Sequence, residues 1–240
     1  MSFKLKVIRK FKANFMRFKM HGVFGPFENF MINMGNLSRL SRWRKNNSNL
    51  KFNDFYLSKW DYMKRFALYE FIIKEENLGQ AVNYLEYGVA AGRSFKWWVE
   101  NNKHADSRFY GFDTFTGLPE DWNMFKAGAM STGGVLPDVK DDRAFFVKGM
   151  FQDSLPDFLL SFKDDKRKII HLDADLYSST LYVLAKLHPL LKKNDVILFD
   201  EFAVPQSEFL AFTNFVNAFR FEYEVIAAAN NYMFVAMKVK

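Results

Sequence analysis

Two short acidic stretches hold the side chains best suited to chemistry in this chain. Asp173 and Asp175 lie in the first stretch, and Asp200 and Glu201 lie in the second. Two carboxylates about 4 Å apart repel by roughly 4 kcal/mol at an effective dielectric constant near 20, so a cation, a shared proton or solvent must offset the repulsion. An all-oxygen ligand set suits a hard ion such as Mg²⁺. The alternative is that these are solvated loop acids that cap the helix after them.

The residues around the acids predict how they are positioned. Apolar runs at 168–170 and 195–199 precede the two pairs and suit buried strands, while residues 178–191 between them repeat leucine and valine at helical spacing. The sequence therefore predicts strand, helix, strand, with two parallel strands joined by a right-handed crossover. All four carboxylates would then lie at the carboxyl ends of neighbouring strands, where open α/β sheets bind ligands.

A turn with two glycines follows an earlier predicted strand. It contains Glu86, Gly88, Gly92 and Ser94, and it leads into the aromatic helix pattern that holds Trp97 and Trp98, for which we expect a packing role. Glycines here let the backbone approach a ligand, and helix N-terminal amides can face an anionic group. The spacing differs from the dinucleotide pattern Gly-x-Gly-x-x-Gly, so hydride transfer is disfavoured. A tight strand–helix turn without a ligand is the alternative.

Two further predicted strands end in residues that could hold a nucleoside. Asp113 ends the first, and an acid at this point can bind ribose hydroxyls. Phe151 follows the second and could face an aromatic base, while Gln152 or Asp153 reaches its amine. A helix cap by Asp153 or Ser154 is the alternative. His171 lies on a strand, and we expect a hydrogen-bonded structural histidine rather than a catalytic one.

The rest of the chain predicts the frame around these residues. We expect a helix at 58–77, with Ser58 as N-cap and Gly79 as C-cap, and another at 207–219. Strands at 221–228 and 232–239 are joined at Asn230-Asn231, which implies one antiparallel strand at the end of a parallel sheet. Residues 121–143 lack periodicity and are predicted to form a lid over the substrate.

Composition limits the chemistry and separates the N-terminal part from the rest. The chain has 240 residues, 49% hydrophobic residues and no cysteine, which excludes disulfides, thiolate catalysis and Cys-ligated zinc. Residues 1–51 carry twelve Lys/Arg and one acid, a net charge of +11, so the remainder carries −4 within the whole-chain charge of +7. No segment has the ~20 apolar residues that span a bilayer, and no signal peptide is evident, so we expect a soluble cytoplasmic protein.

Residues 1–20 alternate basic and bulky apolar side chains, which indicates a basic amphipathic helix. Such a helix could lie on an anionic membrane or dock on a partner, but packing on the domain or across a dimer is favoured, and we expect a homo-oligomer. Nucleic-acid binding is not expected, because no recognised nucleic-acid fold accompanies the charge. Residues 21–51 contain glycines and an Asn/Ser cluster and are predicted to be loops with short helices.

Several segments together resemble the macrocin O-methyltransferase family of S-adenosylmethionine-dependent enzymes, whose relatives act on mycinamicin and novobiocin sugars. The resemblance covers roughly residues 60–240 and leaves residues 1–55 unmatched. The segments that carry it are 84–94, 110–120, 149–156, 171–180 and 197–202, of which Gly-Phe-Asp-Thr-Phe-Thr-Gly-Leu-Pro-Glu (111–120) and Leu-Asp-Ala-Asp-Leu-Tyr-Ser-Ser-Thr (172–180) are the most specific.

The resemblance implies a Mg²⁺-dependent methyl transfer to a sugar hydroxyl of a glycan or a glycosylated natural product. Asp173, Asp200 and Glu201 would bind the metal, and Asp175 would be the general base. Some relatives use a His three residues after the first metal Asp, where this chain has Leu176. The implied cofactor residues are Glu86, Gly88, Gly92 and Ser94 for the methionine end, Asp113 for the ribose, Phe151, Gln152 and Asp153 for the adenine, and Asp173 beside them.

The sequence as a whole predicts a Rossmann-like class I methyltransferase, with a mostly parallel seven-stranded sheet, one antiparallel strand and helices on both faces. Residues 56–240 would form this domain, and residues 1–55 a basic, Phe-rich extension that packs, contacts a dimer partner or acts as a lid. Two other functions stay open: a metal-free methyltransferase that relies on Asp175 alone, and a non-catalytic protein that binds the cofactor or docks through its basic extension.

Overall fold

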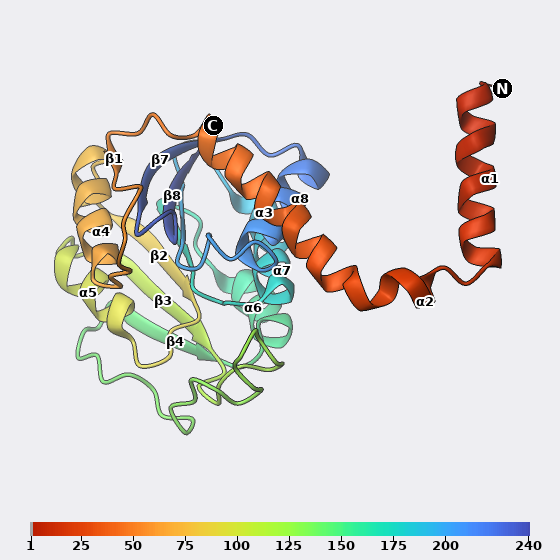
Figure 1. Cartoon of the computed structure of the whole chain (residues 1–240). Helices are drawn as coiled ribbons and strands as arrows, with labels where there is room; N and C mark the ends of the chain where they lie inside the picture. The colour runs from red at the N-terminus through yellow and green to blue at the C-terminus, as the bar shows by residue number, and fades with distance from the viewer. Residues whose placement is uncertain (1) are drawn as a thin grey trace.

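A computed structural model describes residues 2–240 and has one mixed β-sheet with helices on both faces (Figure 1). The strand order is β1-β7-β8-β6-β5-β2-β3-β4, and only β8 runs antiparallel to its neighbours. The strands are β1 Phe52–Asn53, β2 Val82–Tyr87, β3 Arg108–Asp113, β4 Ala144–Lys148, β5 Arg167–Leu172, β6 Val196–Phe199, β7 Tyr223–Ala229 and β8 Phe234–Val239.

The predicted fold class is confirmed, including the single antiparallel strand. The sheet has eight strands rather than seven because β1 adds to its edge, beside β7. A two-residue strand is too short to show an alternating pattern, so it could not be predicted from the sequence. The predicted turn at Asn230-Asn231 is present, and both residues have a positive φ.

Five helices cover the two faces of the sheet: α4 Lys64–Glu75, α5 Arg93–Asn101, α6 Phe151–Ser161, α7 Tyr177–Leu187 and α8 Glu208–Phe219. The 3₁₀ turn η2 His188–Leu190 and a short loop connect α7 to β6, and a short loop connects α8 to β7. Helices α4 and α5 bury their apolar residues on one face, and α6, α7 and α8 bury theirs on the other. Trp98 is fully buried against Tyr69 and Tyr84, so the expected packing role of the aromatic helix is confirmed. Both faces are buried, which explains the uninterrupted apolar run of β6.

The chain order creates a switch point in the middle of the sheet. Strands β2, β3 and β4 extend to one edge, and the chain then returns to place β5 on the other side of β2. Strands β5 and β6 are parallel neighbours, with Leu172 opposite Phe199. Asp173 and Asp200 follow these two residues directly, so the prediction that the acidic stretches end neighbouring strands is confirmed.

The predicted helix at 58–77 is correct in type but wrong at its start. Helix α4 begins at Lys64, and its N-cap is Met63 rather than Ser58. The preceding segment instead follows the β7–β8 turn: the Asp61 amide donates to the Asn230 side chain at 2.9 Å, and Leu57 bonds the Asn231 side chain through both its amide and its carbonyl. These tertiary contacts outweigh the local capping signal.

The N-terminal part is more helical than predicted. Helix α1 Phe3–Arg17 agrees with the amphipathic helix indicated for residues 1–20. Residues 21–51 were expected to be loops with short helices, but they contain α2 His21–Phe24, the 3₁₀ turn η1 Gly25–Phe27 and the 19-residue helix α3 Glu28–Asn46. The end of α3 packs on the body: Leu40 is buried, and the Trp43 indole N–H donates to the Tyr223 hydroxyl at 2.9 Å.

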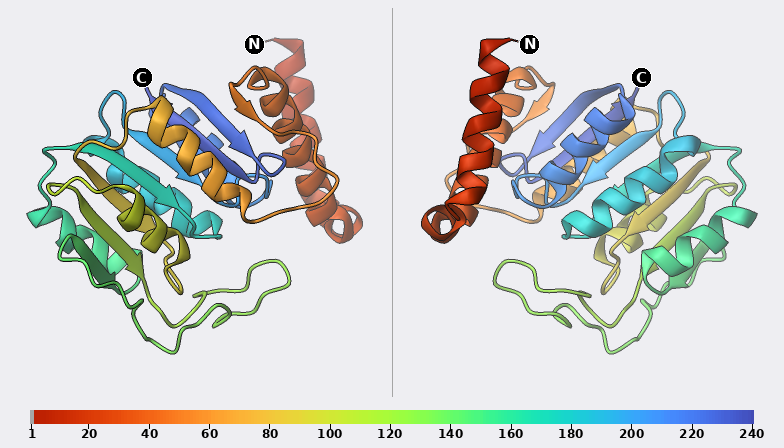
Figure 2. Two further views of the ribbon diagram at one scale, coloured as in Figure 1. Left: turned by 90° about the vertical axis from the view of Figure 1, so that its left-hand side faces the viewer. Right: turned by 90° about the vertical axis from the view of Figure 1, so that its right-hand side faces the viewer.

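We call residues 2–35 the arm, because they project from the body as bent helices (Figures 1 and 2). Helix α1 has no buried residue. Within the described residues, no helix is both long and apolar enough to cross a bilayer.

Residues 121–143 form a long loop without helix or strand, apart from a bridge between Trp122 and Phe125 (Figure 2). The Trp122 indole N–H donates to the Ser207 hydroxyl at 2.9 Å, which ties the loop to the start of α8. Farther along, Met130 contributes to the wall of the pocket described below. This position is the one that a lid requires.

Candidate active site

One pocket opens at the carboxyl ends of β2, β3, β5 and β6, at the switch point of the sheet. Acidic, glycine and apolar residues from distant segments of the chain meet there. The lining residues are Arg65, Gly88, Ala90, Asp113, Thr114, Gly117, Leu118, Pro119, Met130, Met150, Phe151, Gln152, Asp173, Ala174, Asp175, Ser179, Asp200 and Glu201. The pocket thus contains all four predicted acids, together with Gly88, Asp113, Phe151 and Gln152.

Asp113 organises the half of the pocket that we call the cofactor half. One of its oxygens accepts hydrogen bonds from the amides of Val89 and Ala90, both at 2.8 Å, and the other accepts from the Phe115 amide at 2.6 Å. The carboxylate therefore links the turn after β2 to the turn after β3, and it stands at the pocket wall with its geometry fixed.

The two motif glycines are required by contacts between chain segments. Gly88 has a φ of +92°, and a Cβ added there would lie 1.8 Å from the Asp173 carbonyl oxygen. Gly92 has a φ of +77°, and its added Cβ would lie 2.7 Å from the Cβ of Pro137 in the long loop. Gly88 lines the pocket and Gly92 does not, so the tight-turn interpretation accounts for both residues without a ligand.

The start of α6 contributes an aromatic ring and an amide side chain to the pocket wall. Phe151 is the first residue of the helix, and its ring meets Tyr87 edge-on with centroids 5.5 Å apart. Gln152 lines the pocket with it, whereas Asp153 does not. Neither Asp153 nor Ser154 is the N-cap, which is Met150.

The opposite wall, which we call the acidic half, holds Asp173, Asp175, Asp200 and Glu201. Asp200 is 2% exposed, and its Oδ2 lies 2.8 Å from the Arg65 guanidinium. Its Oδ1 is buried and has no hydrogen-bond partner among the described residues. The same guanidinium lies 3.7 Å from Asp173, so one cation faces several carboxylates.

Sequence reasoning missed Arg65, because the predicted helix began at residue 58 and did not place Arg65 in its first turn. Lys64 and Arg65 are the first two residues of α4, where the helix dipole disfavours cations. A buried guanidinium at this position indicates a nearby anionic partner. Burial opposes the charge of Arg65, yet Asp200 and Asp173 raise its pKa above the ordinary value.

Crowding of the acids shifts their titration strongly. Burial, Asp200 and Asp113 together raise the pKa of Asp175 to about 7. Burial, with Asp200 and Asp175 next, raises the pKa of Glu201 to about 8. Burial and the neighbouring carboxylates Asp200 and Asp175 also raise the pKa of Asp173 well above its usual range. At neutral pH this half of the pocket therefore takes up protons or another cation.

A buried hydrogen-bond network lies behind the acidic half. His171 is 1% exposed; its Nδ1 is 2.7 Å from the Tyr84 hydroxyl, and its Nε2 is 3.2 Å from the Tyr69 hydroxyl. Glu86 accepts a hydrogen bond from Tyr84, and Ser94 bonds Tyr69. Burial opposes protonation of His171, but Asp200 and Glu86 raise its pKa. The expected hydrogen-bonded, buried state of His171 is thus present.

Not every predicted cofactor residue reaches the pocket wall. Glu86 and Ser94 are buried in the network behind it, Gly92 packs against the long loop, and Asp153 lies outside the lining. Glu86 and Ser94 support the wall from behind: Ser94 is 3.3 Å from the Arg65 guanidinium, and Glu86 faces His171 at 3.6 Å.

The donor atoms allow a test of the predicted metal site. His171, Asp173 and Asp200 each offer one ligand atom, and these atoms lie within 4.8 Å of one another. Glu201 lines the same wall but is not part of this group. Carboxylate oxygens, one of them buried and without a hydrogen bond among the described residues, fit a hard divalent cation. The residues therefore fit a metal ion, with Asp173 and Asp200 common to the predicted set.

Comparison with known proteins gives the same result as the geometry. Residues 85–202, which include the pocket residues of β2 through β6, match a family model described as a methyltransferase domain. The match covers just under half of the chain. No curated protein sequence matches it significantly.

Solved structures share the fold of this domain. The calicheamicin methyltransferase CalS11 superposes with a TM-score of 0.57 at 20% identity, covering 74% of this chain and 78% of CalS11. The O-methyltransferase NovP gives 0.54 at 19% identity, covering 75% and 79%. An apo structure of CalS11 described as a TDP-rhamnose 3'-O-methyltransferase gives 0.54 at 17% identity, covering 85% and 93%. The predicted methyltransferase resemblance is confirmed, and fold and family match together support S-adenosylmethionine as methyl donor.

Proposed function

We propose that this protein is an S-adenosylmethionine-dependent O-methyltransferase that acts, with Mg²⁺, on a hydroxyl of a sugar. The observation that carries the proposal is the pairing of two unlike walls in one pocket. Asp113 and Phe151 offer a nucleoside site on one side, and four carboxylates from two neighbouring strands gather on the other. CalS11 is a TDP-rhamnose 3'-O-methyltransferase and NovP is an O-methyltransferase, and their likeness to this chain supports this acceptor class.

The cofactor half would bind the donor through a few fixed groups. Asp113, held by three backbone amides, would receive the ribose hydroxyls, and Phe151 with Gln152 would line the adenine. Gly88 borders the methionine end, where a side chain is excluded. Glu86, Gly92, Ser94 and Asp153 would act from behind the wall, by holding the turn and the network in place.

The acidic half would then do the chemistry at the acceptor. The sulfonium methyl is already activated, so the enzyme must align it with an oxygen, which can contribute roughly 7–11 kcal/mol. Asp175 lines the pocket, and its pKa of about 7 suits a group that accepts the hydroxyl proton. A divalent cation held by Asp173 and Asp200, with Glu201 beside them, would stabilise negative charge on the acceptor oxygen.

Three measurements test this function. Mass spectrometry of candidate sugars and glycans incubated with isotopically labelled cofactor should show a labelled methyl on oxygen. Methyl transfer should stop in EDTA and return with Mg²⁺. Absence of S-adenosylmethionine binding at high micromolar concentration would reject the enzyme assignment altogether.

One observation favours a second candidate, a metal-free methyltransferase. The Arg65 guanidinium already lies 2.8 Å from Asp200 and 3.7 Å from Asp173, so a protein cation occupies part of the acidic half. In that case turnover would be undiminished in chelator, and Arg65→Gln would reduce it more than Lys64→Gln, a change at the neighbouring residue, which pairs with Asp54 instead.

A further inference from the structure

The arm exposes many large apolar side chains to solvent. Phe3, Phe11 and Phe18 on the first part are 82%, 67% and 63% exposed, and Phe30 on α3 is 67% exposed. The other large exposed apolar residues of the arm are Leu5, Val7, Ile8, Met16, Val23, Phe24, Phe27, Met31, Ile32 and Met34. Contiguous apolar surface of this extent marks an interaction site.

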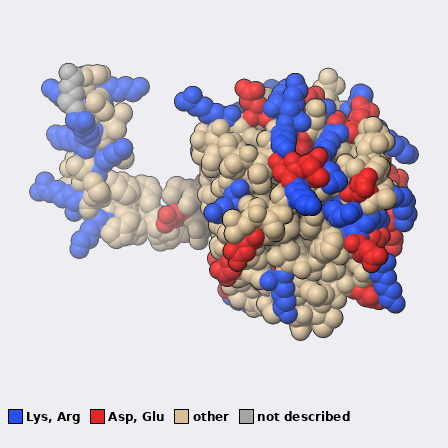
Figure 3. Space-filling model, turned by 180° about the vertical axis from the view of Figure 1, so that it is seen from behind, with Lys and Arg blue, Asp and Glu red and all other residues tan. Residues whose placement is uncertain are grey.

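Helix α1 sorts its side chains by type. Phe3, Val7, Phe11, Phe15 and Phe18 recur at intervals of three or four residues and therefore share one face. The rest of the helix surface carries most of the cations, at positions 6, 9, 10, 12 and 17, together with Leu5 and Met16, and no acid lies between residues 3 and 17. Figure 3 shows Lys and Arg gathered around this end of the arm. The ring contacts of this face stay within the arm, as Phe15 stacks on Phe24 at 5.5 Å.

We propose that the arm docks on an anionic lipid surface, with α1 lying in the plane of the membrane interface. An apolar face of phenylalanines can enter the boundary between headgroups and acyl chains while lysines and arginines on the polar face meet lipid phosphates. Because no helix of the described residues can span a bilayer, the arm lies on the surface and does not cross it.

Charge favours lipid over a second copy of the chain as the occupant. Pairing two α1 helices face to face would bring together two strongly basic segments without a single acid to compensate. On the body, acids such as Glu76, Asp141 and Asp164 already pair with basic residues of the body itself. An anionic bilayer instead supplies the missing negative charge and an apolar phase together.

The test uses the full chain and sedimentation with vesicles. One set contains phosphatidylcholine with phosphatidylglycerol, and the other contains phosphatidylcholine alone. We expect binding to the anionic vesicles that weakens at high salt. Lys6→Gln/Lys10→Gln/Lys12→Gln should lower the partition coefficient roughly 10²-fold, at the usual contribution of a lysine near the surface. Val7→Ser/Phe11→Ser, which keeps the charge, should lower it about tenfold or more.

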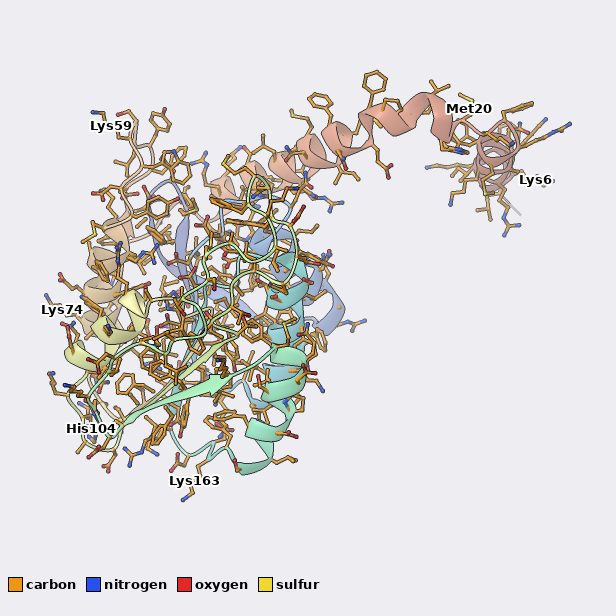
Figure 4. All side chains as sticks on the ribbon, turned by 90° about the horizontal axis from the view of Figure 1, so that it is seen from below. Lys6, Met20, Lys59, Lys74, His104 and Lys163 are labelled. Carbon is orange, nitrogen blue, oxygen red and sulfur yellow. The ribbon has the colours of Figure 1, made fainter. Side chains whose placement is uncertain are left out.

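A matched control removes three lysines from the body, Lys103→Gln/Lys163→Gln/Lys193→Gln. All three are exposed, and Figure 4 shows Lys163 at the far end of the molecule from Lys6. Its binding should stay within about twofold of the unsubstituted protein. Unchanged S-adenosylmethionine affinity in every variant shows that the body is folded, and the vesicle result does not depend on methyl transfer.

Three results would overturn the proposal. They are no binding to anionic vesicles, equal binding to both vesicle types, and an equal loss in the body control. Sedimentation equilibrium without lipid tests the alternative occupant. If the protein does not bind vesicles but forms a dimer, and Val7→Ser/Phe11→Ser dissociates that dimer, the arm binds a second copy of the chain instead of lipid.

Discussion

The carboxylates in the two halves of the pocket differ in how fully their oxygens are hydrogen-bonded. Both oxygens of Asp113 accept from backbone amides, three in all. Asp200 has one oxygen on Arg65, and its other oxygen is buried 3.7 Å from His171 Nε2, without a hydrogen bond among the described residues. The geometry of Asp113 is fixed before any ligand arrives, and a carboxylate with three hydrogen bonds keeps acceptor capacity for a ribose hydroxyl. Asp200 and its neighbours are incomplete, with more negative charge than Arg65 and His171 can offset. The difference separates a preorganised binding wall from a wall built around a cation.

The largest effect should come from the acidic half. Asp173→Asn should lower methyl transfer by about 10³-fold or more, because it removes a ligand and a charge beside the reacting oxygen. S-adenosylmethionine affinity, measured by calorimetry, should change little. Asp157→Asn on the exposed side of α6 is the control. A variant that loses cofactor binding instead would show that the two halves are not separable.

Asp175 should reveal itself in the pH profile. In the unsubstituted enzyme kcat/KM should rise with pH through about 7, because burial and Asp200 keep the carboxyl protonated below that value. Asp175→Asn should lower kcat roughly 10²- to 10⁴-fold and remove this rise. A variant with low activity but the same profile would assign the titration to another group.

The cofactor half should respond in affinity. Asp113→Asn offers one oxygen where three amides now bond, so the turn after β2 should loosen and cofactor affinity fall roughly 10- to 100-fold. At saturating cofactor the rate should fall much less. A rate loss as large as that of Asp173→Asn, with affinity intact, would reverse the assignment of the two halves.

The smallest expected effect is on the pH dependence of the free energy of unfolding, measured in chelator so that no metal ion is bound. The folded-state pKa of Glu201, about 8, lies above its ordinary value of 4.5, so the stability it contributes is complete below pH 4.5 and is lost as the pH rises to 8. The free energy of unfolding should therefore fall between pH 5.5 and pH 8, by about 2–4 kcal/mol from this residue. Glu201→Gln should show a shallower decline in thermal melts. An equally steep decline would mean that Glu201 does not titrate in this range.

The sequence predicted the parts of this pocket that depend on local order along the chain. Asp173 and Asp200 each follow a short apolar strand, and two such strands joined by one helix had to be neighbours. Asp113 and Phe151 were found for the same reason. In each case the residue type and its place at a strand end were enough.

The parts that escaped prediction depend on side-chain direction and on distant segments. Glu86 and Ser94 belong to the motif, yet both are buried behind the wall with His171. Arg65 comes from a helix whose start is set by contacts to Asn230, far along the chain. No local sequence pattern near residue 65 predicts where the β7–β8 turn lies. The position of the Arg65 guanidinium beside the acids could therefore be found only from the structure.

The most direct test of the cation site is to measure Mn²⁺ binding by electron paramagnetic resonance in the presence of S-adenosylhomocysteine, the product of the cofactor. The account predicts about one bound Mn²⁺ per chain, lost in Asp200→Asn and kept in Asp157→Asn. Stoichiometric binding that persists in Asp200→Asn, or none in the unsubstituted protein, would contradict it.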